Sequence, residues 1–132
     1  MNIFSHFNTA LHIIQQYSGK PPLHHYLKQY FANNKKHGSK DRKAITHICY
    51  CYYRIGNALL HVSEKEKALL ALFLCNPQPG LFSALFENDW LQNWNYAFEQ
   101  RLAFAAGKYT QFNQKQIFRF SHQLSEEIDA EK

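Results

Sequence analysis

Side chains suited to binding phosphate are concentrated between residues 35 and 54. Basic residues open this stretch, and basic or aromatic residues then recur every three or four positions, which places them on one face of a helix. The set comprises Lys35, Lys36, His37, Lys40, Lys43, His47, Tyr50 and Arg54. Lys and Arg neutralise phosphates, while Tyr and His rings can stack on exposed bases. The alternative is a solvated, lysine-rich face of the kind that many helices have.

The helix that carries these side chains is predicted to begin at Ser39. Gly38 lets the backbone turn, Ser39 is a good N-cap, and Asp41 suits the positive end of the helix dipole. The opposite face is apolar and comprises Ala44, Ile45, Ile48, Cys49, Tyr52 and Ile55. We therefore expect one face to be buried in a core and the other to meet an anion, with the helix ending near Gly56.

Arg42 is expected at the margin of the apolar face, near Cys49 and Tyr53. There its guanidinium would hold a neighbouring helix or a carboxylate, or else contact nucleic acid. The same two roles, structural or nucleic-acid contact, stay open for Asp41.

The formal net charge of +5 is unevenly distributed. Eight Lys and Arg residues stand against Asp41 alone up to His61, whereas seven basic residues face nine acidic ones from Val62 onward. A basic half of this kind is typical of a protein that binds a polyanion. An ordinary solvated surface would have the same composition, so charge alone does not decide between the two.

Several other chemistries lack the residue spacings they need. The sequence has no C-x-x-C or H-x-x-x-H ligand pair, and its five glycines stand singly rather than in a phosphate-binding loop. Its three cysteines are expected to be reduced. We predict no metal, no active site and no cofactor in this chain. No run of about 18 apolar residues or signal peptide is visible, which favours a cytoplasmic protein without membrane contact.

The apolar spacing predicts further helices on either side of residues 39–55. Their ranges are 3–17, 22–31, 63–75 and 90–105, with a short helical turn over 81–86. Ser63 and Glu66 form a capping-box pattern, and the helical period is lost after Gly107. Because no strand pattern competes, the predicted fold class is all-α, a bundle of about five to six helices.

At these residues the chain resembles a known family. The stretches Pro22 to Phe31, Lys36 to Arg42 and Tyr52-Tyr53-Arg54 are similar to the N-terminal domain of the Fmu/Sun (RsmB-like) ribosomal RNA methyltransferases. Ile117-Phe118 and Leu124 to Asp129 resemble the segment that leads to the catalytic part of those enzymes. Cys51 departs from the family, in which a glycine is usual at this position.

The resemblance implies a NusB-like helical RNA-binding domain over residues 1–116, with residues 117–132 starting a linker towards an absent catalytic domain. The parent protein would be an S-adenosylmethionine-dependent ribosomal RNA cytosine-5 methyltransferase. The family's Pro-Cys catalytic motif has no counterpart here, so S-adenosylmethionine is expected only in the absent domain. The expected partners are RNA, most specifically ribosomal RNA, and that methyltransferase domain. The alternative is a NusB-like protein-interaction module that binds an acidic partner and no RNA.

Overall fold

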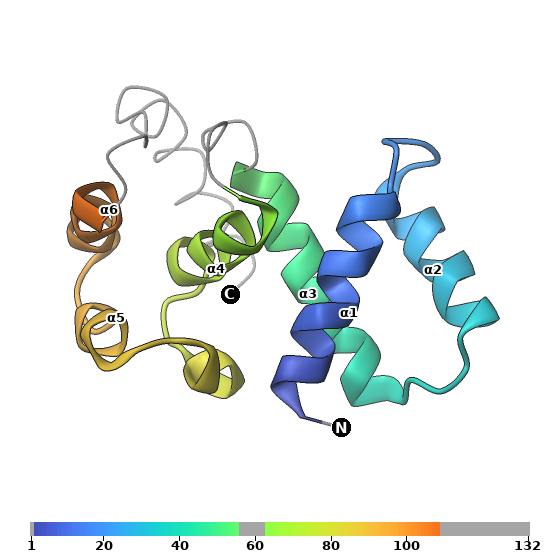
Figure 1. The fold of residues 1–132 in the computed structure, drawn as a ribbon, viewed down its shortest axis with the longest axis horizontal. Helices are drawn as coiled ribbons and strands as arrows, with labels where there is room; N and C mark the ends of the chain where they lie inside the picture. The colour runs from blue at the N-terminus through green and yellow to red at the C-terminus, as the bar shows by residue number, and fades with distance from the viewer. Residues whose placement is uncertain (1, 56–62, 109–132) are drawn as a thin grey trace. The chain divides into compact units, whose positions relative to one another are not determined.

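The computed structural model describes residues 2–55 and 63–108, which form helices joined by short connections (Figure 1). In chain order they are α1 (Ile3–Gln16), α2 (Leu23–Asn33), α3 (Ser39–Ile55), α4 (Glu64–Cys75), the 3₁₀ helix η2 (Gly80–Leu85), α5 (Asn88–Asn93) and α6 (Phe98–Lys108). No strand occurs among these residues, which confirms the all-α prediction. No helix in the described ranges has the length and apolarity that crossing a membrane requires.

The chain divides into two compact units, Met1–Tyr50 and Cys51–Lys132, and the boundary lies within α3. The helical RNA-binding domain expected over residues 1–116 stays a prediction. The linker expected over 117–132 and the helix end expected at Gly56 lie outside the described residues.

The first unit contains α1, α2 and most of α3. Asn2 caps α1 by accepting a hydrogen bond from the Ser5 backbone N–H. After α1 the chain turns through Gly19, whose φ of 97° suits glycine. At the end of α2, the Asn34 side chain donates to the Tyr30 carbonyl at 2.9 Å. These local bonds fix where the helices end, and so where the loop of residues 34–38 begins.

The apolar face predicted for α3 is buried. Ile45, Ile48 and Cys49 are fully inaccessible to solvent, and Ala44, Tyr52 and Ile55 are each less than a tenth exposed. Burying a face of this size is the main source of helix stability in a protein. It also fixes the rotation of α3 about its axis, so Lys40, Lys43 and Tyr50 on the opposite side are exposed.

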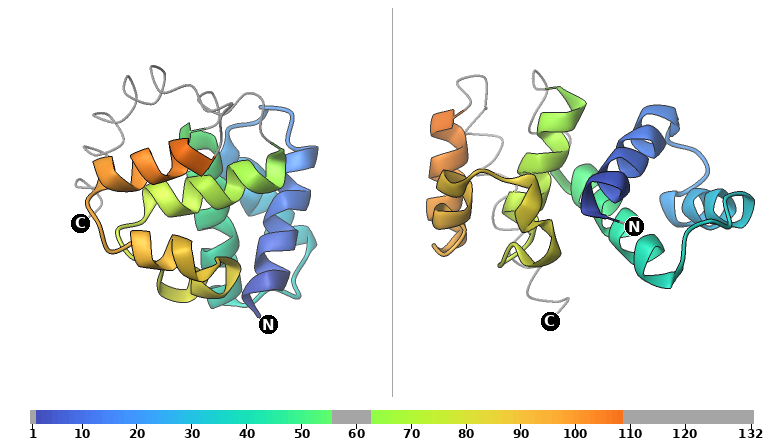
Figure 2. Two further views of the ribbon diagram at one scale, coloured as in Figure 1. Left: turned by 60° about the vertical axis from the view of Figure 1, so that its left-hand side comes forward. Right: turned by 60° about the horizontal axis from the view of Figure 1, so that its bottom comes forward.

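The second unit is built around α4, which is buried on most sides from Ala68 to Cys75. Ser63 accepts from the Glu66 backbone N–H at 3.2 Å, so the predicted N-cap is confirmed. Helix α6 packs against both α4 and α5 (Figures 1 and 2). Phe73 of α4 meets Trp90 and Trp94 edge to face, with ring centroids 4.9 and 5.0 Å away.

One predicted helix is broken in the structure. The sequence favoured a continuous helix over residues 90–105, but α5 ends at Asn93 and α6 begins at Phe98. Trp94 turns inward and donates its indole N–H to the Asn76 carbonyl at 2.8 Å. The Gln100 side chain then accepts from the Ala97 N–H and starts the next helix. The apolar spacing continues across the break, so the spacing did not reveal it.

Candidate functional site

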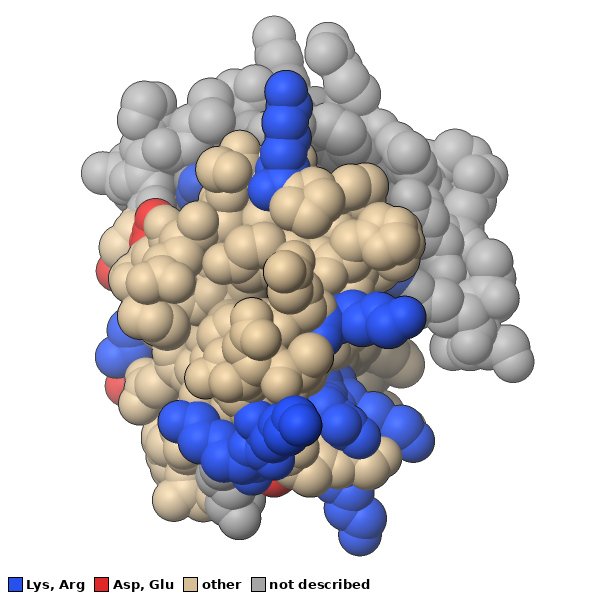
Figure 3. Space-filling model, turned by 90° about the vertical axis from the view of Figure 1, so that its right-hand side faces the viewer, with Lys and Arg blue, Asp and Glu red and all other residues tan. Residues whose placement is uncertain are grey.

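Five exposed cationic side chains gather at the loop before α3 and on its first two turns. They are Lys35, Lys36, Lys40, Arg42 and Lys43, and we call them the basic surface. Figure 3 views the molecule from the side of α2 and shows Lys and Arg side chains crowded together, with little Asp or Glu between them. Such a cluster neutralises phosphates and raises the local concentration of polyanions.

Asp41 is the one acidic residue among residues 1–50, and its carboxylate is already engaged. Its Oδ1 accepts from His6 Nε2 at 2.7 Å, and its Oδ2 accepts from the Gly38 backbone N–H at 3.1 Å. These two bonds hold the pKa of the Asp41 carboxyl below its usual value. Of the two roles left open for Asp41, the contacts support the structural one, because its charge anchors the start of α3 to α1.

The N-cap prediction for α3 needs a correction of one residue. Ser39 is the first residue of the helix, and Gly38 precedes it. The Gly38 carbonyl accepts from the Arg42 N–H at 2.9 Å, and the Gly38 N–H donates to Asp41. Asp41 therefore fills the position from which a capping-box side chain reaches back to the N-cap.

His37 is buried, unlike the lysines around it. Its ring is 3% exposed, stacked on Tyr30 with centroids 6.3 Å apart and meeting Phe31 edge to face. Neither ring nitrogen has a hydrogen-bond partner among the described residues. Burial, and then the neighbouring Lys36, lower the pKa of His37. We therefore leave His37 out of the basic surface, since its ring anchors the loop to the end of α2.

The remaining side chains of the predicted face follow α3 away from the loop. Tyr50 is 36% exposed, and His47 and Arg54 are half-buried. Arg54 belongs to the second unit and lies near the last residue of α3. Arg42 is exposed, although the sequence placed it at the margin of the apolar face. Its exposure groups it with the lysines.

A hollow on α2 was missed by the sequence analysis. Its volume is about 200 Å³, and it is lined by Tyr26, Gln29, Tyr30, Asn33 and Asn34. The first four recur at helical spacing, so a search for polar and aromatic residues on one helix face would have found them. The apolar spacing of residues 22–31 instead predicts a buried stripe that includes Tyr26 and Tyr30, with Asn33 and Asn34 at the end of the helix. In fact Leu27 is the one buried residue of α2.

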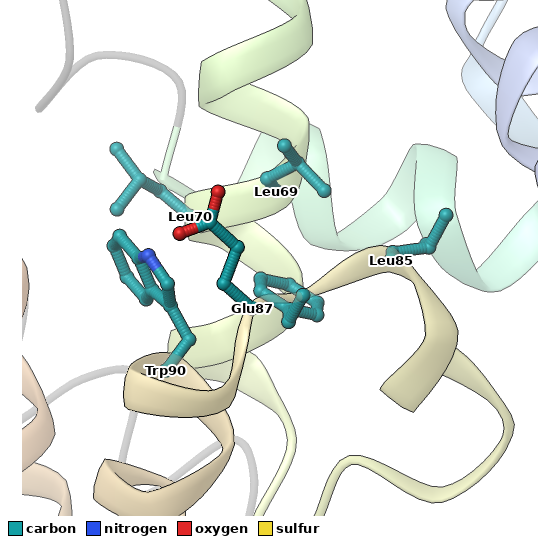
Figure 4. A pocket seen from close by; sticks show the side chains of 6 residues that line it. Leu69, Leu70, Leu85, Glu87 and Trp90 are labelled. Atoms are coloured by element: carbon teal, nitrogen blue, oxygen red, sulfur yellow. The ribbon is translucent and has the colours of Figure 1, made fainter.

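A second hollow of about 200 Å³ lies in the second unit (Figure 4). Leu69 and Leu70 of α4, Leu85 and Phe86, and Trp90 of α5 line it together with Glu87. Figure 4 shows the Glu87 side chain extending from the turn before α5 towards Leu70 and Trp90. Its one carboxylate repels phosphate, so this hollow is not suited to a nucleic acid.

The cysteines are poorly placed for catalysis. Cys49, Cys51 and Cys75 are in the thiol form and all are buried. Burial raises the pKa of Cys49 to about 12, and proximity to Cys75 together with burial raises that of Cys51. Because the thiolate is the reactive form, these groups are poor nucleophiles. Within residues 2–55 and 63–108, no three His, Cys, Asp or Glu side chains converge as metal ligands.

Comparison with known proteins adds no relative: the chain matches no family model, no curated protein and no solved structure.

Proposed function

We propose that this chain binds RNA through the basic surface, as an accessory domain of a ribosomal RNA methyltransferase. The observation that carries the proposal is the cluster of Lys35, Lys36, Lys40, Arg42 and Lys43, exposed together around one helix start. Asp41 is the one acidic residue among residues 1–50. Its carboxylate accepts hydrogen bonds from His6 and from the Gly38 N–H, and these bonds do not involve the five cations. The cluster's charge is therefore available to phosphates.

The shape of the surface supports a polyanion rather than a single small anion. The five side chains are distributed along the chain over a loop and the first two turns of α3. A nucleic-acid backbone offers a row of phosphates that several separated cations can contact together. Tyr50, partly exposed further along α3, adds a ring on which a base can stack.

The family resemblance supplies the finer part of the proposal. Similarity of the stretches around Arg42 and Arg54 to the Fmu/Sun enzymes favours ribosomal RNA as the target. On this proposal the S-adenosylmethionine site and the catalytic cysteine belong to a methyltransferase domain outside this sequence. The role of this chain is to hold the RNA.

Fluorescence anisotropy with a labelled, structured RNA over a series of salt concentrations tests the proposal. Each phosphate contact that is lost should flatten the slope of log affinity against log salt by about 0.7–0.9. The double variant Lys35→Gln/Lys36→Gln should therefore bind more weakly and with a slope lower by up to about 1.8. Phosphate contacts carry no base information, so the loss should be similar for different RNA sequences.

The matched control is Lys20→Gln/Lys28→Gln, which removes the same charge from exposed lysines outside the basic surface. It should leave affinity and slope close to those of the wild type. If the two double variants lose equal RNA affinity, the net charge of the protein and not this surface attracts RNA. If the chain binds an acidic polypeptide and no RNA, the protein-interaction alternative replaces the proposal.

A further inference from the structure

The hollow on α2 has a chemical character different from that of the basic surface. Tyr26, Gln29, Tyr30 and Asn33 share one face of the helix, and Asn34 closes its end. Among the described residues that line it there is no charged side chain. The lining is therefore a combination of two phenol rings and three carboxamides.

Carboxamides and aromatic rings are the groups that proteins use to hold an unpaired base. The edge of a base presents hydrogen-bond donors and acceptors side by side, and a carboxamide offers both an N–H₂ and a C=O. Aromatic rings supply a stacking surface for any base. One N–H of Asn34 is used by the Tyr30 carbonyl, but its Oδ1 takes no part in that bond. Burial raises the pKa of Tyr30, so its hydroxyl stays neutral beside an anion.

The size of the hollow limits the ligand. Its volume of about 200 Å³ is smaller than the roughly 300–1,000 Å³ of sites for drug-sized molecules. It suits one flat ring system rather than a whole nucleotide. A sugar and its phosphates would have to lie outside the hollow.

The adjoining residues provide a place for those phosphates. Asn34 lines the hollow and is followed directly by Lys35 and Lys36 of the basic surface. The Tyr30 ring, which also lines it, is stacked on His37 with an angle of 24° between the ring planes. This stacked pair fixes the loop against the end of α2. Figure 3, which looks onto α2, shows an uncharged area of surface bordering the cluster of Lys and Arg.

We propose that the hollow lined by Tyr26, Gln29, Tyr30 and Asn33 binds one unpaired nucleobase, whose flanking phosphates lie on Lys35 and Lys36. This inference rests on the proposed RNA-binding function and makes it specific. The chain then prefers RNA with an unpaired loop or bulge to fully paired RNA, since a base inside a duplex cannot enter the hollow.

The experiment compares two RNA probes with equal numbers of phosphates: a hairpin with an unpaired loop and a fully paired duplex. Anisotropy titrations at one salt concentration give the affinity of the wild type for each. We expect the hairpin to bind about tenfold more tightly, because this ratio corresponds to the binding free energy of roughly one stacked and hydrogen-bonded base. Equal affinities would overturn the inference and leave the proposed function standing.

The informative variant is Gln29→Ala/Asn33→Ala, because both side chains are exposed and neither removes charge. It should lower hairpin affinity about fivefold or more towards that of the duplex, with an unchanged salt slope. Its control is Asn8→Ala/Gln15→Ala, the same two substitutions at exposed positions of α1. Tyr26→Leu should act like the informative variant, with thermal melting as a check because Tyr26 contacts Tyr17 at 4.9 Å between ring centroids.

The possible failures are distinguishable. One outcome is that Lys35→Gln/Lys36→Gln lowers the affinity for both probes while Gln29→Ala/Asn33→Ala lowers the affinity for neither. In that case the proposed base site is wrong and the proposed RNA-binding surface is right. If the wild type binds neither probe, both the inference and the proposed function fail.

Discussion

His6 of α1 and Asp41 in the first turn of α3 are joined by a 2.7 Å hydrogen bond between Nε2 and Oδ1. The two residues are 35 positions apart, and the His6 side chain is 9% exposed. The same carboxylate accepts from the Gly38 N–H. One side chain therefore ties the loop of the basic surface, the start of α3 and α1 together. The bonds of this carboxylate go to His6 and Gly38, and they position the start of α3.

The first prediction is that Asp41→Ala lowers the stability of the first unit. Because the pKa of Asp41 is lowered in the folded state, its contribution is present at neutral pH. That contribution should be lost as the pH falls below about 4, where the unfolded carboxyl takes up its proton first. Thermal melts followed by circular dichroism at pH 7 and pH 3 should differ more for the wild type than for the variant.

Asp89→Ala is the control for this prediction. Asp89 also lies in the first turn of a helix and pairs with Lys108, but both side chains are about two fifths exposed. An exposed ion pair of this kind contributes little to stability. If Asp89→Ala destabilises the protein as much as Asp41→Ala, the bond to His6 is not the anchor we describe.

The second prediction concerns His37 and mild acid. Burial and Lys36 lower its folded pKa, so the unfolded chain binds the proton first as the pH falls through about 6.5. Stability should therefore decrease between about pH 7 and pH 5, and His37→Phe should make this decrease shallower. Urea denaturation followed by circular dichroism at several pH values measures it. A parallel pH dependence in variant and wild type would contradict the burial of His37.

The third prediction concerns Arg101 in the second unit. Its side chain is 5% exposed, and Nη1 donates to the carbonyls of Phe73, at 2.8 Å, and Asn76 at the end of α4. Arg101→Met leaves the Phe73 carbonyl without this donor, which should cost about 1–3 kcal/mol. Trp90 and Trp94, the protein's two tryptophans, both lie in this unit, so their fluorescence during denaturation reports the loss.

Ala103→Met introduces the same side chain on the exposed side of α6 and serves as the control. It should change the free energy of unfolding by less than about 0.5 kcal/mol. A similarly small effect of Arg101→Met would show that the two carbonyls find other partners.

The sequence predicts those features of the fold that depend on residues close together in the chain. The buried arc of α3 and the Ser63 cap were predicted correctly, because helical period and capping act within a few residues. The burial of Arg101 was not predictable in this way, since its bonds reach Phe73, 28 residues earlier. Charged side chains are rarely buried without a partner. Here the partners are backbone carbonyls, which every residue has, so residue types do not identify them.

In the candidate site, too, the features set by neighbouring residues were predictable and those set by distant contacts were not. The run from Lys35 to Lys43 is visible in the sequence and is exposed in the structure, apart from His37 and Asp41 among its charged or titratable residues. Those two exceptions depend on packing between helices. His37 is covered by Tyr30 and Phe31, and Asp41 meets His6. Spacing along one helix cannot show which neighbouring element covers a residue at its end.

The last prediction is that Arg42→Gln weakens RNA binding and leaves stability nearly unchanged. The sequence placed Arg42 at the margin of the apolar face, where its loss would have lowered stability. Because the side chain is exposed, its removal should change the free energy of unfolding by less than about 0.5 kcal/mol. The slope of log affinity against log salt should flatten by about 0.7–0.9, as for a lysine of the basic surface.

Arg42→Lys keeps the charge and should keep the slope, whereas Lys28→Gln removes an equal charge from α2 and should not flatten it. Thermal melts and anisotropy titrations on the same preparations measure both quantities. A loss of more than about 1 kcal/mol in Arg42→Gln with the wild-type slope would return Arg42 to a structural role. The basic surface would then comprise the four lysines alone, and a quadruple Lys→Gln variant would be expected to remove all of its phosphate contacts.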